Sequence, residues 1–424
     1  MTWALLILPV ALFALGLPVF AVLLGGAVVA VLVSGGSLQP LTLHQVMFGG
    51  INQVALLAVP FFIFAGELMS RAGIADRLID WVLALTGRTR GSLAMAAVGA
   101  STVMGAVSGS SPATVAAVGR VLYPRLKDGA YGRPFSLGLI VSSGSIAIVI
   151  PPSIAMILYG ASAEQSIPRL FQAGLLPGLL IAACMGAYIL WRTRRATAAE
   201  GEPFSAGRLV RATWRALAAL AMPVLVLAGI YSGWFSPTEA GGVACLYAAL
   251  VGLFVHRALS WRGLCAAAAE SAYLTAQILV IVAAAGTFSW VLTVQGVPQG
   301  LLAWIVGLDL SPAGFLVAIN LALLGIGCLL DPTSAILVLT PILVPILAHL
   351  GIDPIHFGIV MTVNLSIGMF TPPFGLNIFV AQSVLDPDLA AIYRGILPFA
   401  AIQIAALAVI TYIPDLSLLL PMLL

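Results

Sequence analysis

Long apolar segments separated by short polar stretches follow one another along almost the whole chain. By hydropathy these segments cover 3–15, 17–33, 44–70, 91–122, 134–163, 169–191, 217–231, 237–256, 265–293, 311–350, 355–385 and 391–413. A helix needs about 20 apolar residues to cross the hydrocarbon core of a bilayer, and most of the segments reach that length. Two further stretches, 74–85 and 297–308, are too short to span it. The pattern predicts an all-α polytopic membrane protein, in which residues 1–33 form either one long helix or two short ones.

The sequences on either side of a polar, basic stretch at 192–215 resemble each other. Four short motifs recur in the same order about 220 residues apart. The pairs are 73–81 with 296–304, 111–114 with 331–334, 150–152 with 371–373, and 174–177 with 395–398. We therefore predict two copies of one structural unit, in residues 1–191 and 216–424, joined by a linker at 192–215.

The positions of the 18 Lys and Arg residues predict the orientation of the spans. Basic loops stay in the cytoplasm, so the linker at 192–215, with six arginines, is placed there. If the spans cross the membrane in alternating directions on either side of this linker, Arg169 is the only basic residue that falls outside the cytoplasm. This holds only if the segments 91–122 and 311–350 each enter and leave the membrane on the same side. The lack of charge in 91–119 and the Asp331-Pro332 pair within 310–352 support such re-entrant hairpins independently. One hairpin then opens to the cytoplasm and the other to the outside, so the two halves are inverted copies.

The composition excludes several classes of protein. Hydrophobic residues make up 61% of the chain and charged residues 8%, whereas a soluble domain is about 25% charged. The net charge is +3 and Lys127 is the single lysine, so the chain has no basic surface that could bind the phosphate backbone of a nucleic acid. This excludes nucleic-acid binding. The four cysteines lie scattered in apolar segments without a C-x-x-C pair, which is typical of small core residues.

The sequence does not predict an enzyme. It contains no G-x-S-x-G, H-E-x-x-H or G-x-x-x-x-G-K motif. Its serine clusters have no histidine at their depth that could act as a general base. Without an ATP site, uphill transport would have to use an ion gradient, and one charge moving through 100 mV yields about 2.3 kcal/mol.

Four apolar segments are interrupted by small hydroxyl residues combined with Gly or Pro. The interruptions lie at 108–112, 142–152, 328–334 and 364–377, two in each half. Non-helical backbone at membrane depth occurs only where it is buried in protein or lines a cavity. Freed carbonyls beside hydroxyl groups suit a hard cation such as Na+, and a freed helix N-terminus can hold a carboxylate. Paired breaks of this kind indicate the site of a secondary transporter, although close helix packing alone can explain any single Ser, Gly or Pro.

Two acidic residues have two interpretations each. Asp331 is the only charge between Asp309 and Asp353, which favours a functional role inside the membrane, but Asp followed by Pro is also a good helix N-cap. Glu67 lies four residues before Arg71, so it is either an interfacial ion-pair residue or a ligand. Since no basic residue is predicted at the midplane, an anionic substrate would depend on bound cations and helix N-termini.

Six short motifs of the chain belong together. They are Phe61-Phe-Ile-Phe-Ala-Gly-Glu-Leu-Met69, Ser108-Gly-Ser-Ser-Pro-Ala-Thr114, Ile150-Pro-Pro-Ser-Ile154, Leu339-Thr-Pro-Ile-Leu343, Gly351-Ile-Asp-Pro-Ile-His-Phe-Gly358 and Thr371-Pro-Pro-Phe-Gly-Leu-Asn377. With these motifs the chain resembles the large membrane subunit of tripartite ATP-independent periplasmic (TRAP) transporters. The resemblance implies a multi-pass protein of the bacterial inner membrane, surrounded by lipid. It further implies two partners, a small four-helix membrane subunit supplied by a separate chain and a periplasmic substrate-binding protein. The implied activity is Na+-coupled import of a carboxylate-containing metabolite, such as a C4-dicarboxylate or sialic acid, by an elevator-type slide.

The resemblance also assigns the predicted elements. In the first half these are scaffold helices in 1–70, an arm helix at 74–85, a hairpin at 91–122, a broken helix at 134–163 and a helix at 169–191. In the second half they are scaffold helices in 217–293, an arm at 297–308, a hairpin at 311–350, a broken helix at 355–385 and a helix at 391–413.

Site residues follow from the same resemblance. The residues expected to hold Na+ are Ser108, Gly109, Ser110, Ser143, Gly144 and Ser145 in one half and Asp331, Thr333, Ser334, Asn364, Ser366 and Thr371 in the other. Those expected to contact the substrate are Ser110, Ser111, Thr114, Ser153, Thr333 and Asn377. The alternatives are an ion-coupled transporter of another substrate class that needs no binding protein, a channel, or a membrane scaffold protein without transport activity.

Overall fold

The structure is a computed structural model that describes residues 9–33 apart from Val10 and Ala14, and residues 40–87, 89–129, 131–194 and 203–423. Its regular elements are all helical in this part of the chain. Seven of its helices are long and apolar enough to cross a membrane. The prediction of an all-α polytopic protein is therefore confirmed.

The helices of the first half come in the predicted order. They are α2 (Val19–Val33), α3 (Pro40–Ile51), a 3-10 turn η1 (Val54–Leu57), α4 (Ala58–Arg71), α5 (Ile74–Thr86), α6 (Ser92–Ser108), α7 (Ser111–Asp128), α8 (Arg133–Ser143), a 3-10 turn η2 (Gly144–Ile148), α9 (Ile154–Ser162) and α10 (Ile167–Thr193). The second half holds α11 (Ala206–Tyr231), α12 (Pro237–Leu250), a π turn η3 (Val251–Val255), α13 (Trp261–Val294), α14 (Val297–Gly307), α15 (Pro312–Gly327), α16 (Pro332–Leu350), α17 (Pro354–Gly368), α18 (Leu376–Leu385), α19 (Leu389–Tyr412) and α20 (Asp415–Leu423).

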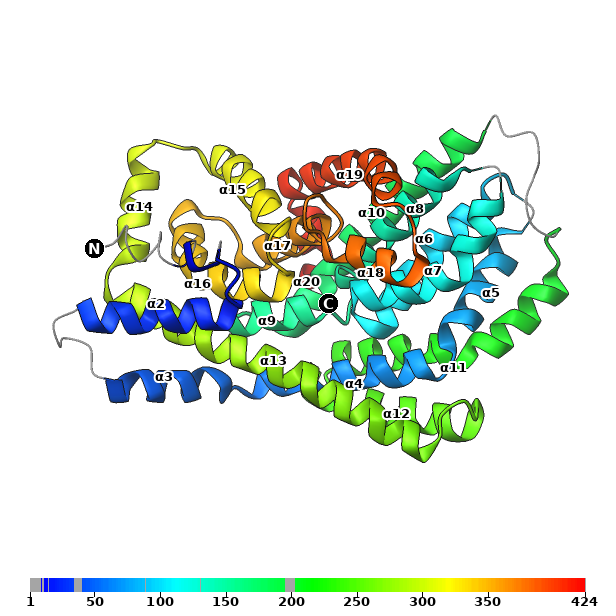
Figure 1. Ribbon diagram of the computed structural model, residues 1–424, viewed down its shortest axis with the longest axis horizontal. Helices are drawn as coiled ribbons and strands as arrows, with labels where there is room; N and C mark the ends of the chain where they lie inside the picture. Colours follow the sequence, from blue (N-terminus) through cyan, green and yellow to red (C-terminus); the bar gives the residue numbers. More distant parts are fainter. Residues whose placement is uncertain are drawn as a thin grey trace.

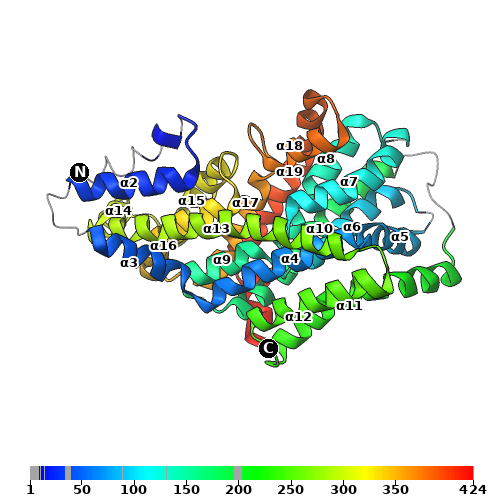
Figure 2. The same cartoon turned by 60° about the horizontal axis from the view of Figure 1, so that its bottom comes forward.

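The helices form two layers. In the scaffold layer, which comprises α2–α4 and α11–α13, the long helix α13 packs on α2, α3 and α4 (Figure 2). In the hairpin layer, which comprises α6–α10 and α15–α19, α8 packs on α19 and α7 on α18, so each half contacts the other. The short helices α5 and α14 stand at opposite ends of the molecule (Figure 1). These two helices correspond to the stretches 74–85 and 297–308, and their role as arms stays a prediction.

The two halves repeat the same local devices. Helices α5 and α14 both follow a glycine in the left-handed region, Gly73 at φ 66° and Gly296 at φ 69°. In both halves the first helix of the hairpin closely approaches the broken helix. In the first half, α6 approaches η2 at Gly105, and in the second half, α15 approaches the last turn of α17 at Gly327. A Cβ on Gly105 would lie 2.5 Å from Cα of Ala147, and one on Gly327 would lie 3.3 Å from Cα of Gly368. The prediction of two inverted repeats, each with a hairpin and a discontinuous helix, is confirmed.

Two boundaries differ from the prediction. Helix α11 begins at Ala206, inside the stretch 192–215 that we assigned to the linker. Its first turns carry arginines, which lower the hydropathy but are good helix formers whose long stems cover apolar surface. The segment 44–70 is interrupted after Ile51, since Gln53 is extended (φ −116°, ψ 126°). Hydropathy alone does not register such a break.

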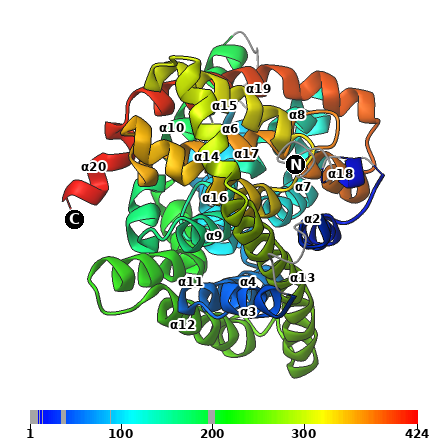
Figure 3. The ribbon, with the colours of Figure 1, turned by 90° about the vertical axis from the view of Figure 1, so that its left-hand side faces the viewer.

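The structure also answers the question left open for residues 1–33 and adds a helix near the end of the chain. A turn at Leu15 and Gly16 (φ 83°) precedes α2, so residues 1–33 do not form one continuous helix, and residues 1–8 lie outside the described part. Helix α20 was not predicted. It packs on α10 and α17 at the side of the molecule (Figure 3), where His356 bonds through its ring nitrogens to the hydroxyl of Ser417 (3.3 Å) and the carbonyl of Thr411 (3.2 Å). The division of the chain into the units 1–191 and 216–424 stays a prediction.

Candidate functional site between the hairpin tips

A cavity of about 330 Å³ brings the tips of the two hairpins together. The tips contribute Ser108 to Ala113 and Asp331 to Thr333, and the scaffold helices α4 and α13 contribute the opposite wall. That wall consists of Ile63, Gly66, Glu67, Ser70, Leu274 and Ile278. Among the described residues that line the cavity, the charged ones are Glu67 and Asp331, both acidic. The amino ends of α7 and α16 meet at this cavity, which lies against a largely apolar scaffold surface.

The first hairpin turns at Gly109. This residue adopts φ 58°, and a Cβ there would lie 2.7 Å from the carbonyl oxygen of Pro152, so only glycine fits. The hydroxyl of Ser110 then caps α7 by accepting a bond from the amide of Ala113 (3.5 Å). Thr114 donates to the carbonyl of Ser110 (2.9 Å). The hydroxyls of Ser108 and Ser110 are thereby held at the cavity, whereas Thr114 lies behind them.

The second hairpin turns at Asp331. Its carboxylate accepts bonds from the amide of Ser334 (3.1 Å) and from the hydroxyl of the same residue (2.5 Å). The N-cap interpretation of Asp331 is confirmed. The same carboxylate lines the cavity with Thr333, so a role in binding a cation is compatible with the cap and stays a prediction.

Glu67 forms the ion pair that was one of its two interpretations, and its role as a ligand stays a prediction. It pairs with Arg71, which also pairs with Glu270 of α13, and it lines the cavity. The ion-pair interpretation is confirmed, and the pair holds the carboxylate at the edge of the cavity.

Asn377 connects the two halves beside the cavity. Its amide nitrogen donates to the hydroxyl of Ser111 (2.8 Å) and to the carbonyl of Val141 (3.1 Å). The side chain is completely buried and does not line the cavity. Ser111, by contrast, lines it. Asn377 therefore supports the hairpin tip from behind.

We expect Asn377→Ala to lower the thermal stability of the protein. The substitution leaves the hydroxyl of Ser111 and the carbonyl of Val141 without this buried partner, which costs about 1–3 kcal/mol. Thermal unfolding in detergent measures the loss. Ser383→Ala is the matched control, because Ser383 is an exposed residue of the same helix whose hydroxyl bonds only to the carbonyl of Val380. An equal melting temperature for Asn377→Ala and the unaltered protein would contradict the bridging role.

Several predicted residues lie near the tips but do not line the cavity. Ser143 shares a bond with the hydroxyl of Ser101 (3.0 Å), and Ser145 donates to the carbonyl of Ser142 (2.7 Å) and to the amide oxygen of Gln403 (3.0 Å). Gly144 packs on Val115 of α7. The remaining ones, Ser153, Ser366 and Thr371, donate to backbone carbonyls of Ile148, Val363 and Ile367. Each of these three hydroxyls therefore already has a backbone acceptor.

Among the predicted site residues, Asn364 has a buried side-chain oxygen without a hydrogen-bond partner. Its amide nitrogen donates to the carbonyl (2.9 Å) and to the side-chain oxygen (2.8 Å) of Asn320. Its own Oδ1 has no hydrogen-bond partner, and the residue is completely buried. Buried polar atoms are nearly always satisfied, so an exception requires a reason such as an ion. No group of three or more His, Cys, Asp and Glu residues that could hold a metal ion occurs among the described residues.

Sequence reasoning missed two amides that the structure places at the breaks. Asn320 of α15 bonds Asn364, and Gln403 of α19 bonds Ser145 and, through its nitrogen, the carbonyl of Ser142 (3.0 Å). Each is an isolated amide within an apolar stretch of its helix. That isolation is the signal that could have identified them, because polar side chains within membrane helices are costly.

Comparison with known proteins identifies close relatives in sequence. The model of the family described as "Tripartite ATP-independent periplasmic transporter, DctM component" matches residues 6–416. The C4-dicarboxylate TRAP transporter large permease protein DctM of Pseudomonas aeruginosa is 42% identical over 377 residues, covering 88% of both chains. The ectoine TRAP transporter large permease protein TeaC of Halomonas elongata is 39% identical over 390 residues, covering 91% of this chain and 90% of TeaC.

Solved structures of distant sequence share the fold. MtrF of Neisseria gonorrhoeae, described as one of a class of antimetabolite efflux pumps, superposes with a TM-score of 0.62 at 15% identity, over 90% of this chain and 85% of MtrF. The YdaH transporter of Alcanivorax borkumensis gives a TM-score of 0.56 at 16% identity, over 87% and 86% of the two chains. At such low identity the likeness concerns the architecture alone.

Proposed function

Because the chain belongs to the DctM family, the large permease subunits of TRAP transporters, we propose that it imports a small carboxylate-bearing metabolite together with Na+. It is a multi-pass protein of the bacterial inner membrane, and its family works with a small membrane subunit and a periplasmic binding protein. Relatives are named for C4-dicarboxylates, ectoine and 2,3-diketo-L-gulonate. The proposed substrate is accordingly a C4-dicarboxylate, sialic acid or a similar organic acid.

The charge of the cavity between the hairpin tips carries the proposal. Its charged lining residues in the described part of the chain are Asp331 and Glu67, and Glu67 shares Arg71 with Glu270, so a carboxylate entering alone would meet a site of net negative charge. The amino ends of α7 and α16 offset this repulsion in part, because they carry positive partial charge. Bound Na+ supplies the remaining counter-charge. Substrate and Na+ then bind more tightly together than apart, and this coupling is reciprocal.

The second half offers the better-supported Na+ site. The unsatisfied Oδ1 of Asn364 lies in α17, whose last turn contacts the end of α15 through Gly368 and Gly327. Carbonyls released where α15 and α17 end, together with Asn364 and the Asp331–Ser334 turn, form a set of hard oxygen ligands suited to Na+. The first half would use Ser108 to Ser110 with Ser143 to Ser145 in the corresponding way.

Removal of sodium tests the proposal. We expect the complete transporter in proteoliposomes to lose organic-acid uptake when Na+ outside is replaced by K+ or choline. We also expect Na+ to increase the rate of uptake steeply when it is restored in the presence of the binding protein. Uptake at full rate in a sodium-free medium would overturn the proposal.

The wall of the cavity supports an elevator-type slide of the hairpin layer along the scaffold layer. The scaffold side presents Ile63, Leu274 and Ile278, apolar residues that can exchange neighbours without breaking hydrogen bonds. At Gly66 a Cβ would lie 3.2 Å from Cα of Ser108, so the hairpin tip rests directly on α4. Gly66 lies near the end of α4 that the charge distribution places on the cytoplasmic side. We therefore propose that the structure represents the state of the transporter that opens to the cytoplasm.

A pair of engineered disulfides tests this motion. We expect the pair Gly66→Cys and Ser108→Cys, once oxidised, to stop uptake, and reduction to restore whatever activity the unoxidised pair retains. The control pair is Gly50→Cys with Gly286→Cys, where a Cβ on Gly50 would lie 3.9 Å from Cα of Gly286 within the scaffold layer. Oxidation of this control should leave uptake unchanged. Undiminished uptake with the first pair fully oxidised would exclude the slide.

A further inference from the structure

A second cavity, of about 470 Å³, lies at the end of the molecule formed by α5, α6, α7 and α11. Five arginines line it, and the only acid among its lining residues in the described chain is Asp80. These arginines are Arg77 of α5, Arg125 of α7, and Arg208, Arg211 and Arg215 of α11. The cavity lies apart from the hairpin tips and shares no lining residue with that site.

Hydrogen bonds between α5 and α11 hold one wall of this basic cavity. The indole nitrogen of Trp81 on α5 donates to the hydroxyl of Thr213 on α11 (3.1 Å), and Arg208 donates to the carbonyl of Leu83 (3.4 Å). Arg77 donates to the carbonyl of Gly73 (2.8 Å), and Arg211 to that of Gly207 (3.2 Å). The acceptors of Arg77 and Arg211 are neutral carbonyls, so these bonds orient the two guanidinium groups without neutralising them.

The opposite wall comes from the hairpin layer. Arg125 is an exposed residue in the last turn of α7, the second arm of the first hairpin. An anion in the cavity would therefore contact both α11 of the scaffold layer and α7 of the hairpin layer. Guanidinium groups bind phosphate through paired hydrogen bonds, and a cluster of them is typical of phosphate recognition.

The surroundings favour a lipid as the source of that phosphate. Helix α11 directs its arginines toward the cavity, while Val210, Trp214 and Leu217, on its other side, are exposed and apolar. Leu85 and Phe204 are also exposed, and Phe204 packs on Gly87 at the rim of the cavity. Acyl chains could follow these side chains. The arginines lie on the side that the charge distribution assigns to the cytoplasm, where basic pockets between membrane helices bind anionic head groups.

We propose that this cavity binds the phosphate of an anionic phospholipid head group, which joins α7 of the hairpin layer to the short helix α5 and to α11 of the scaffold layer. The binding itself does not require that the chain transports any particular substrate or uses Na+. Anionic lipid should therefore bind the purified complex whether or not uptake is sodium-dependent.

Binding of short-chain lipids to the permease in complex with its small membrane subunit tests the proposal. Native mass spectrometry and thermal unfolding are recorded with dioctanoyl phosphatidylglycerol, dioctanoyl phosphatidylcholine and inorganic phosphate. We expect phosphatidylglycerol to bind and raise the melting temperature, and the other two to bind far more weakly. The double variant Arg125→Gln with Arg211→Gln should weaken phosphatidylglycerol binding by roughly tenfold or more, since each paired guanidinium–phosphate contact is strong.

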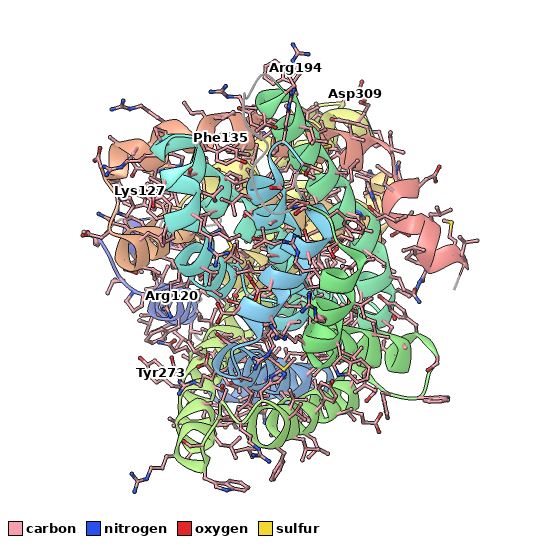
Figure 4. The ribbon with its side chains drawn as sticks, turned by 90° about the vertical axis from the view of Figure 1, so that its right-hand side faces the viewer. Arg120, Lys127, Phe135, Arg194, Tyr273 and Asp309 are labelled. Atoms are coloured by element: carbon pink, nitrogen blue, oxygen red, sulfur yellow. The ribbon has the colours of Figure 1, made fainter. Side chains whose placement is uncertain are left out.

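Arg120→Gln with Lys127→Gln is the matched control. Both residues are exposed positions of α7 that do not line the cavity, and in Figure 4 they lie to one side of α5 and α11. This control removes the same charge and should bind phosphatidylglycerol like the unaltered complex. Equal weakening by both double variants, or equal binding of phosphatidylcholine, would overturn the site. Inorganic phosphate binding as tightly as phosphatidylglycerol would overturn the assignment to lipid and identify a soluble phosphate as the ligand.

Discussion

Asn364→Leu is expected to raise the Na+ concentration needed for half-maximal uptake by roughly tenfold or more. Leucine has a similar volume but no oxygen, and bonds to a charged partner are worth about 1.5–3 kcal/mol, which is tenfold or more in affinity. The expectation rests on the buried, unpartnered Oδ1 of this residue. Uptake by the complete transporter, measured as a function of Na+ at saturating substrate, gives the value.

Two further variants separate ion binding from packing. Asn364→Asp keeps an oxygen at the place of Oδ1 but loses the amide donor to Asn320, so Na+ should still support uptake while the thermal stability of the protein falls. Thr362→Val removes a buried hydroxyl in the same helix that bonds only to the carbonyl of Gly358 (2.7 Å), and it should leave the Na+ dependence unchanged. If Asn364→Leu lowers the maximal rate while its Na+ dependence stays that of the unaltered protein, the residue has a structural role alone.

Gly395→Val is expected to prevent assembly of the folded protein. A Cβ on Gly395 would overlap the carbonyl oxygen of Pro134, and a Cβ on Gly138 would overlap the carbonyl oxygen of Gly395. Helices α8 and α19 therefore cross with their backbones in contact, which ties the first half to the second. Overpacking costs about 1–3 kcal/mol where side chains can move aside, and here the obstacle is backbone, so the loss should exceed that range. Size-exclusion profiles and yield of the detergent-extracted protein measure the effect.

The control for this substitution is another helical glycine. Gly325 in α15 has no atom within 4 Å of the position that a Cβ would take. Gly325→Val should therefore be extracted and purified in normal yield. Normal yield of Gly395→Val would mean that the two helices can separate without loss of the fold, and the crossing would then not be essential.

Much of the fold follows from the order of residues alone. Hydropathy locates the spans, because a backbone in lipid has to satisfy its own hydrogen bonds within helices. The recurrence of 150–152 at 371–373 indicates the repeat, and the distribution of arginines indicates that 91–122 and 311–350 turn back within the membrane. The start of α11 at Ala206 was not predictable in this way, because a helix rich in arginine docks on α5 through Trp81 and Thr213 and not through apolar runs.

The candidate site was predicted in part. Ser110 and Asp331 belong to breaks at matched positions, and the structure places both at one cavity. Their separation in sequence gives no measure of their distance, so the meeting of the two tips followed only from the repeat and the family resemblance. Ser153 and Thr371 look equivalent to Ser110 in sequence, yet their hydroxyls are taken by backbone carbonyls nearby.

What the sequence by itself determined is therefore the class of protein, the inverted repeat and the identity of the polar breaks, since these depend on local composition and on the cost of polar groups in lipid. The tertiary structure alone decided which breaks face each other, which polar atoms remain unsatisfied, and where arginines from α5, α7 and α11 surround a common space. The reason is physical: a serine or asparagine within an apolar segment has to find a partner, and only the packing of distant helices determines whether that partner is a carbonyl, another side chain or an ion.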